Sequence, residues 1–224
     1  MPGRRVVRVV GLVSIALGLT AWAFGGWAVI TVDDFPETVT VTQPTTLSFM
    51  VRQHGVTPLE RLSPRVTATD GKSEIDVPVS AEMVPGRYSS KLVLPKAGDW
   101  SITVRSGFVT SDIKLPPVRA VARGAASPPA RLPADRGQRL FVAKGCVTCH
   151  VHDAVSALGY KSLEVGPELT PKRYEPAYLR RFLTDPSIAR TPGRPEMPKL
   201  GLSNAELTAL VAFINADRSV AAQR

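Results

Sequence analysis

The chain has 224 residues, enough for one large domain or two small ones, because domains usually run to roughly 100–150 residues. Hydrophobic residues make up 44% and charged residues 21%, which is ordinary for a folded chain and argues against wholesale disorder. The formal net charge is +9, but no segment is a dense run of Lys and Arg interleaved with aromatic residues. We therefore expect no nucleic-acid partner.

The first predicted element is a membrane anchor at residues 9–32. These 24 uncharged residues would span about 36 Å as a helix, and a hydrocarbon core is about 30 Å thick. Three arginines precede the run and acidic residues follow it, which by the positive-inside rule places residues 1–8 in the cytoplasm. Trp22 and Trp27 suit the membrane interface. We expect a single-pass transmembrane signal anchor in contact with the lipid bilayer, with everything after it on the periplasmic, extracytoplasmic side of the cytoplasmic membrane.

A cleaved signal peptide is the alternative for the same segment. Its apolar region would be residues 9–20, and Ala21, Trp22 and Ala23 form an A-x-A-like cleavage site. The apolar run continues nine residues past Ala23, which favours the uncleaved anchor. Both interpretations export the rest of the chain.

Residues 33–115 change to short alternating runs bounded by Gly, Pro and Asp, as in TVTVT, TLSFMVRQ and GDWSITVRSG. Seven such runs over about 80 residues predict an antiparallel, immunoglobulin-like β-sandwich. Ile102 and Val104 alternate with polar neighbours, as in a half-buried strand. Asp70-Gly71 is a hairpin signal.

The stretches VRQHGVTPLERLSP (51–64) and PGRYSSKLVLPKAGDWSITV (85–104) resemble the FixH-like or YtkA-like family of small extracytoplasmic immunoglobulin-like domains. That family is associated with assembly of copper-containing oxidases. The resemblance raises a copper site at Met50, Met83 and His54, because thioether and imidazole suit copper. We expect instead that both methionines fill space and that His54 is a loop residue, since no second His or Cys stands nearby.

Residues 116–134 are rich in Pro and Ala, with arginines between them. Such a stretch forms no core, so it is predicted to be a linker that tethers the last domain, or simply connects it. In the following region, residues 135–145 predict a short helix ending at Gly145. Ser203 and Glu206 form a capping box for a final helix with one apolar face.

Between these two helices lies CVTCH, residues 146–150, which holds both cysteines of the chain. A C-x-x-C-H run is the attachment signature of c-type haem, whereas a zinc site needs further ligands. Two thiols three residues apart can each bond one haem vinyl group, and the adjacent His150 then lies beneath the iron. A thioredoxin-like pair is the alternative, but the βαβ context of that fold is missing.

Iron in an electron carrier needs a sixth ligand, and Met197 is the methionine of this region. Pro195 and Pro198 stiffen its loop. His152 is the substitute ligand, but it lies two residues from His150 and would need a chain reversal. We expect it at the surface or beside a haem propionate. Arg180 and Arg181 are candidates for propionate contacts, although an Arg pair on a helix more often faces solvent.

Residues 135–224 resemble a class I monohaem cytochrome c. The resemblance rests on CVTCH, on Gly166-Pro167-x-Leu169, on a helix-like stretch at 178–185 and on Met197-Pro198-x-Leu200. It implies an all-α domain with one covalently bound haem c. By this resemblance Cys146 and Cys149 form thioethers, and His150 and Met197 are the axial iron ligands. The carbonyl of Pro167 accepts a hydrogen bond from the proximal ring, and Gly137 and Phe141 pack the first helix against the last.

The sequence thus predicts a multi-domain chain: a transmembrane helix, an all-β sandwich and an all-α cytochrome c domain. Its expected function is to carry single electrons between the extracytoplasmic faces of respiratory or photosynthetic membrane redox complexes, without transforming a substrate. One alternative is a subunit or assembly factor of a haem-copper oxidase, with a copper- or partner-binding β domain. Another is a haem sensor in which a gas displaces Met197.

Overall fold

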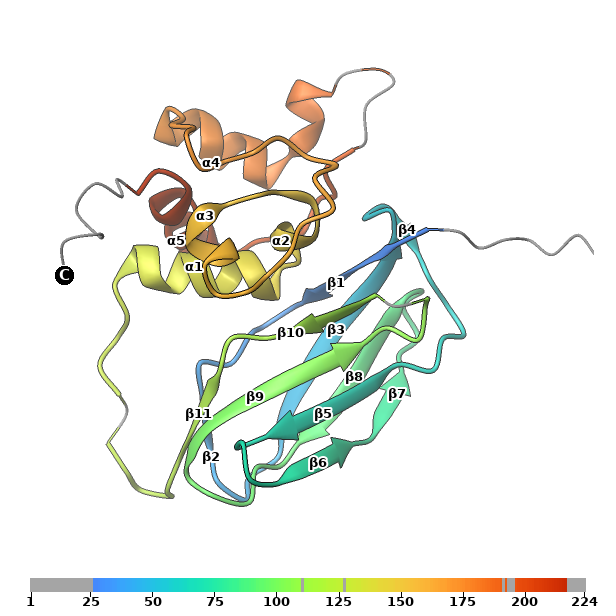
Figure 1. Cartoon of the computed structure of the whole chain (residues 1–224), viewed down its shortest axis with the longest axis vertical. Coiled ribbons are helices and arrows are strands. Elements are labelled where there is room, and N and C mark those ends of the chain that lie inside the picture. Colours follow the sequence, from blue (N-terminus) through green and yellow to red (C-terminus); the bar gives the residue numbers. More distant parts are fainter. Residues whose placement is uncertain (1–25, 110, 127, 191, 193–195, 217–224) are drawn as a thin grey trace, which may run out of the picture.

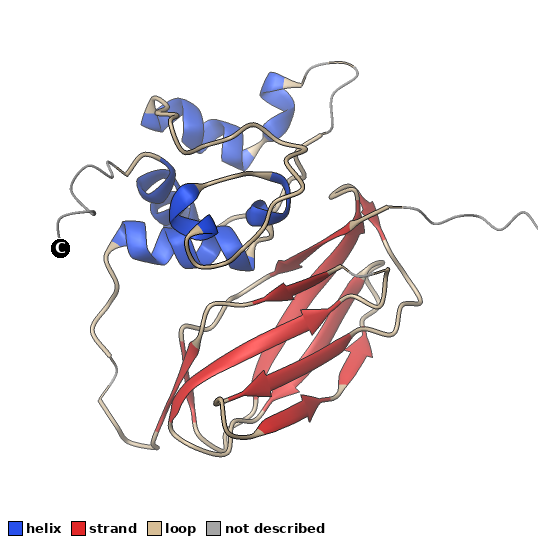
Figure 2. Ribbon diagram, in the orientation of Figure 1, coloured by secondary structure: helices blue, strands red, loops and turns tan. Residues whose placement is uncertain are grey.

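A computed structural model of the chain describes residues 26–109, 111–126, 128–190, 192 and 196–216 (Figure 1). Strands fill the first half of the described chain and helices the second. The helical part lies along the side of the strand-rich part that contains β1 (Figure 2). The segment that holds CVTCH and the strand-rich part are therefore neighbours in space as well as in sequence.

The strand-rich part consists of two sheets, a five-stranded one with path β1-β3-β8-β7 and a six-stranded one with path β2-β11-β9-β5-β6. Pairing is antiparallel except between β11 and β2. The first sheet comprises β1 (Ala28–Val32), β3 (Thr45–Gln53), β4 (Thr57–Pro58), β7 (Val79–Ala81) and β8 (Arg87–Leu92). The second comprises β2 (Thr38–Thr40), β5 (Arg65–Thr69), β6 (Glu74–Val77), β9 (Gly98–Arg105), β10 (Asp112–Lys114) and β11 (Val118–Val121).

The expected alternation is found in β9, where Trp100, Ile102 and Val104 are fully buried. They meet Phe49 and Tyr88 from the other sheet in one apolar core. The hairpin predicted at Asp70-Gly71 joins β5 to β6. The Asp70 carboxylate accepts hydrogen bonds from the backbone of the following turn, so the turn is fixed locally.

The prediction of a membrane helix over residues 9–32 is wrong at its end, because Ala28–Val32 form β1 and pair with β3. All five residues of β1 are buried. A short apolar run without alternation fits a buried strand as well as a helix, which explains the error. Residues 1–25 lie outside the residues that the structure describes. Among the described residues, no helix has the length and apolarity needed to span a bilayer.

The linker predicted at 116–134 is also too long. Val118–Val121 form β11, in which Val118 and Ala120 are buried while Arg119 points outward. Prolines precede this two-residue alternation and a segment of small residues and prolines follows it, which obscures the pattern in the sequence. The connection between the sheets and the first helix is correspondingly shorter, from residue 122 to residue 132.

The helical part comprises α1 (Pro133–Ala143), α2 (Cys146–Cys149), α3 (Asp153–Ser156), α4 (Pro176–Thr184), a 3-10 turn (Pro186–Ala189) and α5 (Asn204–Ile214). The capping box of Ser203 and Glu206 is formed in full. Helix α1 packs on α5 as expected: a Cβ on Gly137 would collide with the carbonyl of Ala209, and the rings of Phe141 and Phe213 lie 5.5 Å apart.

A buried ion pair joins the end of α1 to α5 and reaches the sandwich. The Lys144 ammonium lies 2.7 Å from a Glu206 carboxylate oxygen, and both side chains are almost fully buried. Lys144 also donates a hydrogen bond to the backbone carbonyl of Asp33, just after β1. Burial raises the pKa of Glu206, but its bonds to Lys144 and Ser203 outweigh that effect and hold the pKa below the ordinary value of 4.5.

Replacing Glu206 with Gln should destabilise the protein by about 3–5 kcal/mol at neutral pH, because a buried ammonium loses its charged partner. The depressed carboxyl pKa adds stability that is present above about pH 4.5 and is lost as pH falls through the folded-state pKa. Glu206→Gln should therefore also flatten the acid limb of a plot of unfolding free energy against pH. Urea unfolding from pH 7 to pH 3 measures both effects. The double variant Lys144→Met/Glu206→Leu should recover much of the loss at pH 7, and failure to recover it would contradict the charge-pair explanation.

Candidate functional site

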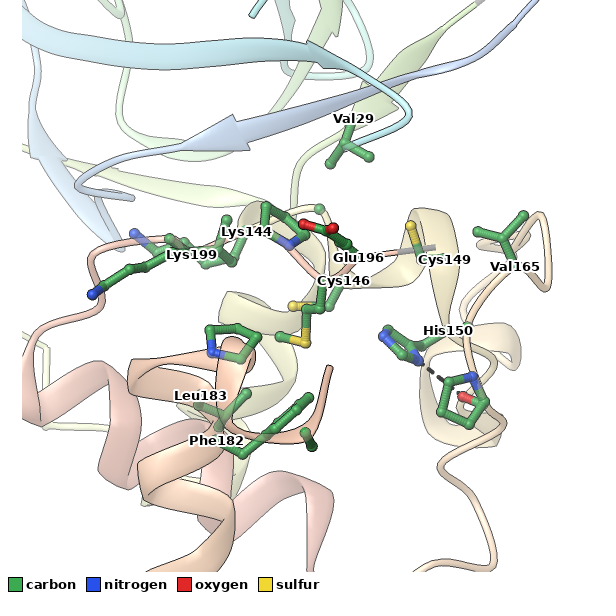
Figure 3. A pocket seen from close by; sticks show the side chains of 18 of the residues that line it. Val29, Lys144, Cys146, Cys149, His150, Val165, Phe182, Leu183, Glu196 and Lys199 are labelled. Carbon is green, nitrogen blue, oxygen red and sulfur yellow. Dashed lines mark hydrogen bonds between the residues drawn. The ribbon is translucent and has the colours of Figure 1, made fainter. Parts of the chain in front are cut away.

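A cavity of about 840 Å³ lies between the helices and the end of the sandwich. This is within the range of roughly 300–1,000 Å³ that ligand pockets in proteins occupy. The structure brings all five predicted site residues into its wall: Cys146, Cys149, His150, Pro167 and Met197. Figure 3 shows the two thiols and the imidazole of His150 at this cavity.

The two cysteines lie on one short helical turn, α2, which starts after Gly145. Gly145 has φ +77, a conformation that glycine adopts without steric cost. Residues three apart on a helix share a face, so both thiols are presented together. Burial, with the neighbouring thiol adding to it, raises the pKa of Cys146 to about 12, and burial raises that of Cys149 to about 11. Such thiols carry little thiolate at neutral pH, which is unlike the low-pKa nucleophile of a thioredoxin-like pair.

His150 is held in one orientation. Its Nδ1–H donates a hydrogen bond to the carbonyl oxygen of Pro167 over 2.9 Å, as the dashed line in Figure 3 marks. Burial lowers the pKa of this imidazole despite that bond, so the ring is neutral at neutral pH. With the proton on Nδ1, the lone pair of Nε2 is available to a metal. Gly166 makes room for the ring, because a Cβ there would lie 2.5 Å from its Cε1.

Met197 is half-buried and packs against the apolar core. Met50 lies in β3, and Met83 lies fully exposed in the turn between β7 and β8. Helix α4 supplies an apolar wall with Leu179, Phe182 and Leu183. The cavity thus offers two thiols, one imidazole and one thioether within apolar walls.

His152 does not lie at the surface as predicted: it is 1% exposed and stacks on Phe213 with ring centroids 4.0 Å apart. Its flat imidazole ring packs on the phenyl ring much as another aromatic side chain does. Arg180 donates a hydrogen bond to Thr208 on α5, and Arg181 is exposed. Neither arginine lines the cavity.

The sandwich also lines the cavity, which the sequence does not predict. The residues concerned come from β1, β3 and the segments beside them: Trp27, Val29, Arg52, His54 and Val56. The rings of Trp27 and His54 lie 5.3 Å apart in this wall, just before β1. No local pattern signals these residues, because the contacts join segments about a hundred positions apart.

A copper site in the sandwich gains no support. Met50 lies within β3, His54 lies in the turn after β3, and Met83 is fully exposed in the turn between β7 and β8. The part of the chain that the structure describes holds no cluster of three or more His, Cys, Asp or Glu side chains able to hold a metal.

The donor set fits a haem. The imidazole and the thioether are the axial pair of a haem iron in cytochromes c. The thiols supply two attachment points, and the apolar walls suit a flat apolar ring.

Comparison with known proteins supports this assignment. Residues 134–216 match the family model described as Cytochrome c. The helical part is thus a cytochrome c segment, its cofactor is covalently bound haem c, and the chain is an electron-transfer haem protein that carries a β-sheet region before that segment. No match is found among curated proteins.

Solved structures resemble the chain only weakly. A ZirS C-terminal domain shares 16% identity, covers 54% of this chain and 87% of its own, and has a TM-score of 0.32. Domains 4 and 5 of the S-layer protein SbsC share 24% identity, cover 42% and 51%, and have a TM-score of 0.31. The Lin-41 filamin domain shares 15% identity, covers 44% and 93%, and has a TM-score of 0.32. These scores are too low to support the FixH-like resemblance or to argue against it.

Replacing both Cys146 and Cys149 with Ala should abolish covalent attachment, because no other cysteine is present. The mass of the denatured double variant should equal that of the polypeptide alone, and a haem stain after denaturing electrophoresis should be lost. Thr148→Ala changes the same helical turn without removing a thiol and should keep covalent haem. Haem that stays covalently bound in the double variant would contradict the assignment.

Proposed function

We propose that the chain is an electron carrier in which Cys146 and Cys149 bind the haem through thioethers, and His150 and Met197 are its axial ligands. The observation that carries the proposal is the meeting of these four side chains in one apolar cavity. The chain transforms no substrate. The haem iron supplies a one-electron couple, while the protein sets its potential and limits access to it.

Each part of the site has a task in this function. The Pro167 carbonyl fixes the His150 tautomer and makes Nε2 a better donor. The thioether of Met197 is a weak ligand that favours the ferrous state, which raises the reduction potential. The apolar side chains of α4 exclude water, which also favours the less charged state. The fixed ligands keep structural change small when the electron moves.

Met197→Ala tests the ligand assignment. Loss of the thioether should lower the reduction potential by on the order of 100 mV, since axial ligands set haem potentials over a wide range. It should also let the ferrous haem bind carbon monoxide at neutral pH, which the parent protein should not do. Met83→Ala removes a fully exposed methionine and should change neither property. Carbon monoxide binding by the parent protein would contradict the proposal and favour the gas-sensor alternative.

We further propose that the carrier is anchored to the cytoplasmic membrane and serves membrane redox complexes from the extracytoplasmic side. The uncharged run before the described residues spans residues 9–25, which is 17 residues and about 26 Å as a helix. That is the lower end of the range for a transmembrane helix, roughly 17–25 residues. The arginines before this run support an N-terminus in the cytoplasm.

The anchor is tested by washing isolated membranes with alkaline carbonate. The anchored chain should stay in the membrane fraction, with a mass that includes residues 1–23. A chain that washes off and lacks those residues would show instead that the signal is cleaved after Ala23. Deletion of residues 2–25 in a secreted version should release the protein without changing its haem spectrum.

A further inference from the structure

The segment that carries the haem-attachment motif rests directly on the sandwich. A Cβ on Gly145 would lie 2.5 Å from Cγ1 of Val29 and 2.6 Å from the carbonyl oxygen of Ile30. Only a glycine fits between Cys146 and strand β1. Figure 3 shows Val29 reaching from the sandwich toward the two cysteines.

The segment that carries Met197 rests on the same end of the sandwich. The turn after β3 contains Gly55, where a built Cβ would lie 3.7 Å from the ring of Pro198 and 3.5 Å from Cγ2 of Val29. The backbone N–H of His54 donates to the carbonyl of Trp27 over 3.0 Å, which ties this turn to the start of β1. Val29 and Pro198 therefore both lie beside Gly55, and Pro198 directly follows Met197.

The position of Val29 on strand β1 shows which part of the protein buries its side chain. Its neighbours Ala28 and Ile30 belong to the apolar core cluster of the molecule, whereas Val29 does not, although it is only 3% exposed. Side chains alternate across a strand, so Val29 points away from the sandwich interior. It is buried by the helical part instead.

Polar contacts hold the two parts in this arrangement. The hydroxyl of Thr31 donates to the carbonyl of Lys144 over 3.4 Å. Between β1 and β2, the carboxylate of Glu37 pairs with Arg131 at 3.0 Å and with Arg136 at 3.2 Å. Residues 196–202 form no helix or strand, so their position depends on such outside contacts.

We propose that the sandwich acts as a clamp on the axial methionine, with Val29 and the turn at His54-Gly55 as its contact points. The clamp rests on the proposed function, since it requires Met197 to bind the iron. It holds the Pro198 segment and the attachment motif at a fixed separation. Loosening it raises the fraction of molecules in which the sixth coordination position is open to an outside ligand. Val29 is in this sense a positioning residue.

Imidazole titration of the full-length ferric protein measures that open fraction. The apparent affinity for an outside ligand scales with the fraction of protein that is competent to bind it. Val29→Ala removes the two methyl groups that lie beside Gly145 and Gly55, and we expect about tenfold tighter imidazole binding, equivalent to about 1.4 kcal/mol. Val66→Ala is the matched control, because Val66 is fully buried in β5 within the sandwich core. It should leave imidazole binding unchanged.

The outcomes separate the clamp from the proposed function. If Val29→Ala binds imidazole like the parent while Met197→Ala binds it far more tightly, the clamp is wrong and the ligand assignment stands. If the parent and Met197→Ala bind it equally, the assignment itself fails. If imidazole binding tightens equally in Val66→Ala and Val29→Ala, the clamp is also overturned. General destabilisation of the sandwich would then be enough to explain the tighter binding.

A second variant covers the case in which Val29→Ala yields no folded haem protein. Glu37→Gln breaks two ion pairs between the parts and leaves every apolar contact in place. The clamp predicts a smaller tightening of imidazole binding in the same direction. High salt screens the ion pairs of the parent protein as well. The difference in imidazole affinity between Glu37→Gln and the parent should therefore shrink as the salt concentration rises. Identical binding by Glu37→Gln and the parent at low salt would overturn the proposal.

Discussion

Burial of β1 on both faces is the constraint on which the rest of the structure depends. One face closes the sandwich core, and the other receives the segment around Gly145. A strand this apolar would be a liability at a free surface, so the helical part must cover it. The covering contact also closes one wall of the haem cavity. Folding of the two parts and formation of the cofactor site are therefore linked.

The contact between the sandwich and the helical part also accounts for the position of the buried Lys144–Glu206 ion pair. Lys144 lies at the junction of α1, the attachment motif and the sandwich, where an unpaired ammonium would be costly. Glu206 supplies its counter-charge from α5 while it also completes the helix cap. One buried pair thus links the final helix, the attachment motif and the sandwich.

The cytochrome site was predictable from sequence because its signals are local. Cys146, Cys149 and His150 fall in five consecutive residues, and the pairing of Ser203 with Glu206 spans one helical turn. The places of Val29 and His54 were not predictable, since they depend on contacts with residues far along the chain. Two predictions fail for this reason: residues 28–32 form strand β1 rather than the end of a membrane helix, and His152 is covered by Phe213 rather than exposed.

The proposed electron carrier needs a haem in the cavity whose iron is bound by His150 and Met197. The visible spectrum of the purified ferric protein tests this most directly, through the weak far-red band of methionine-ligated ferric haem. We expect the band to be present at neutral pH in the full chain. Covalently bound haem without that band would contradict it, because Met197 would then not be the ligand.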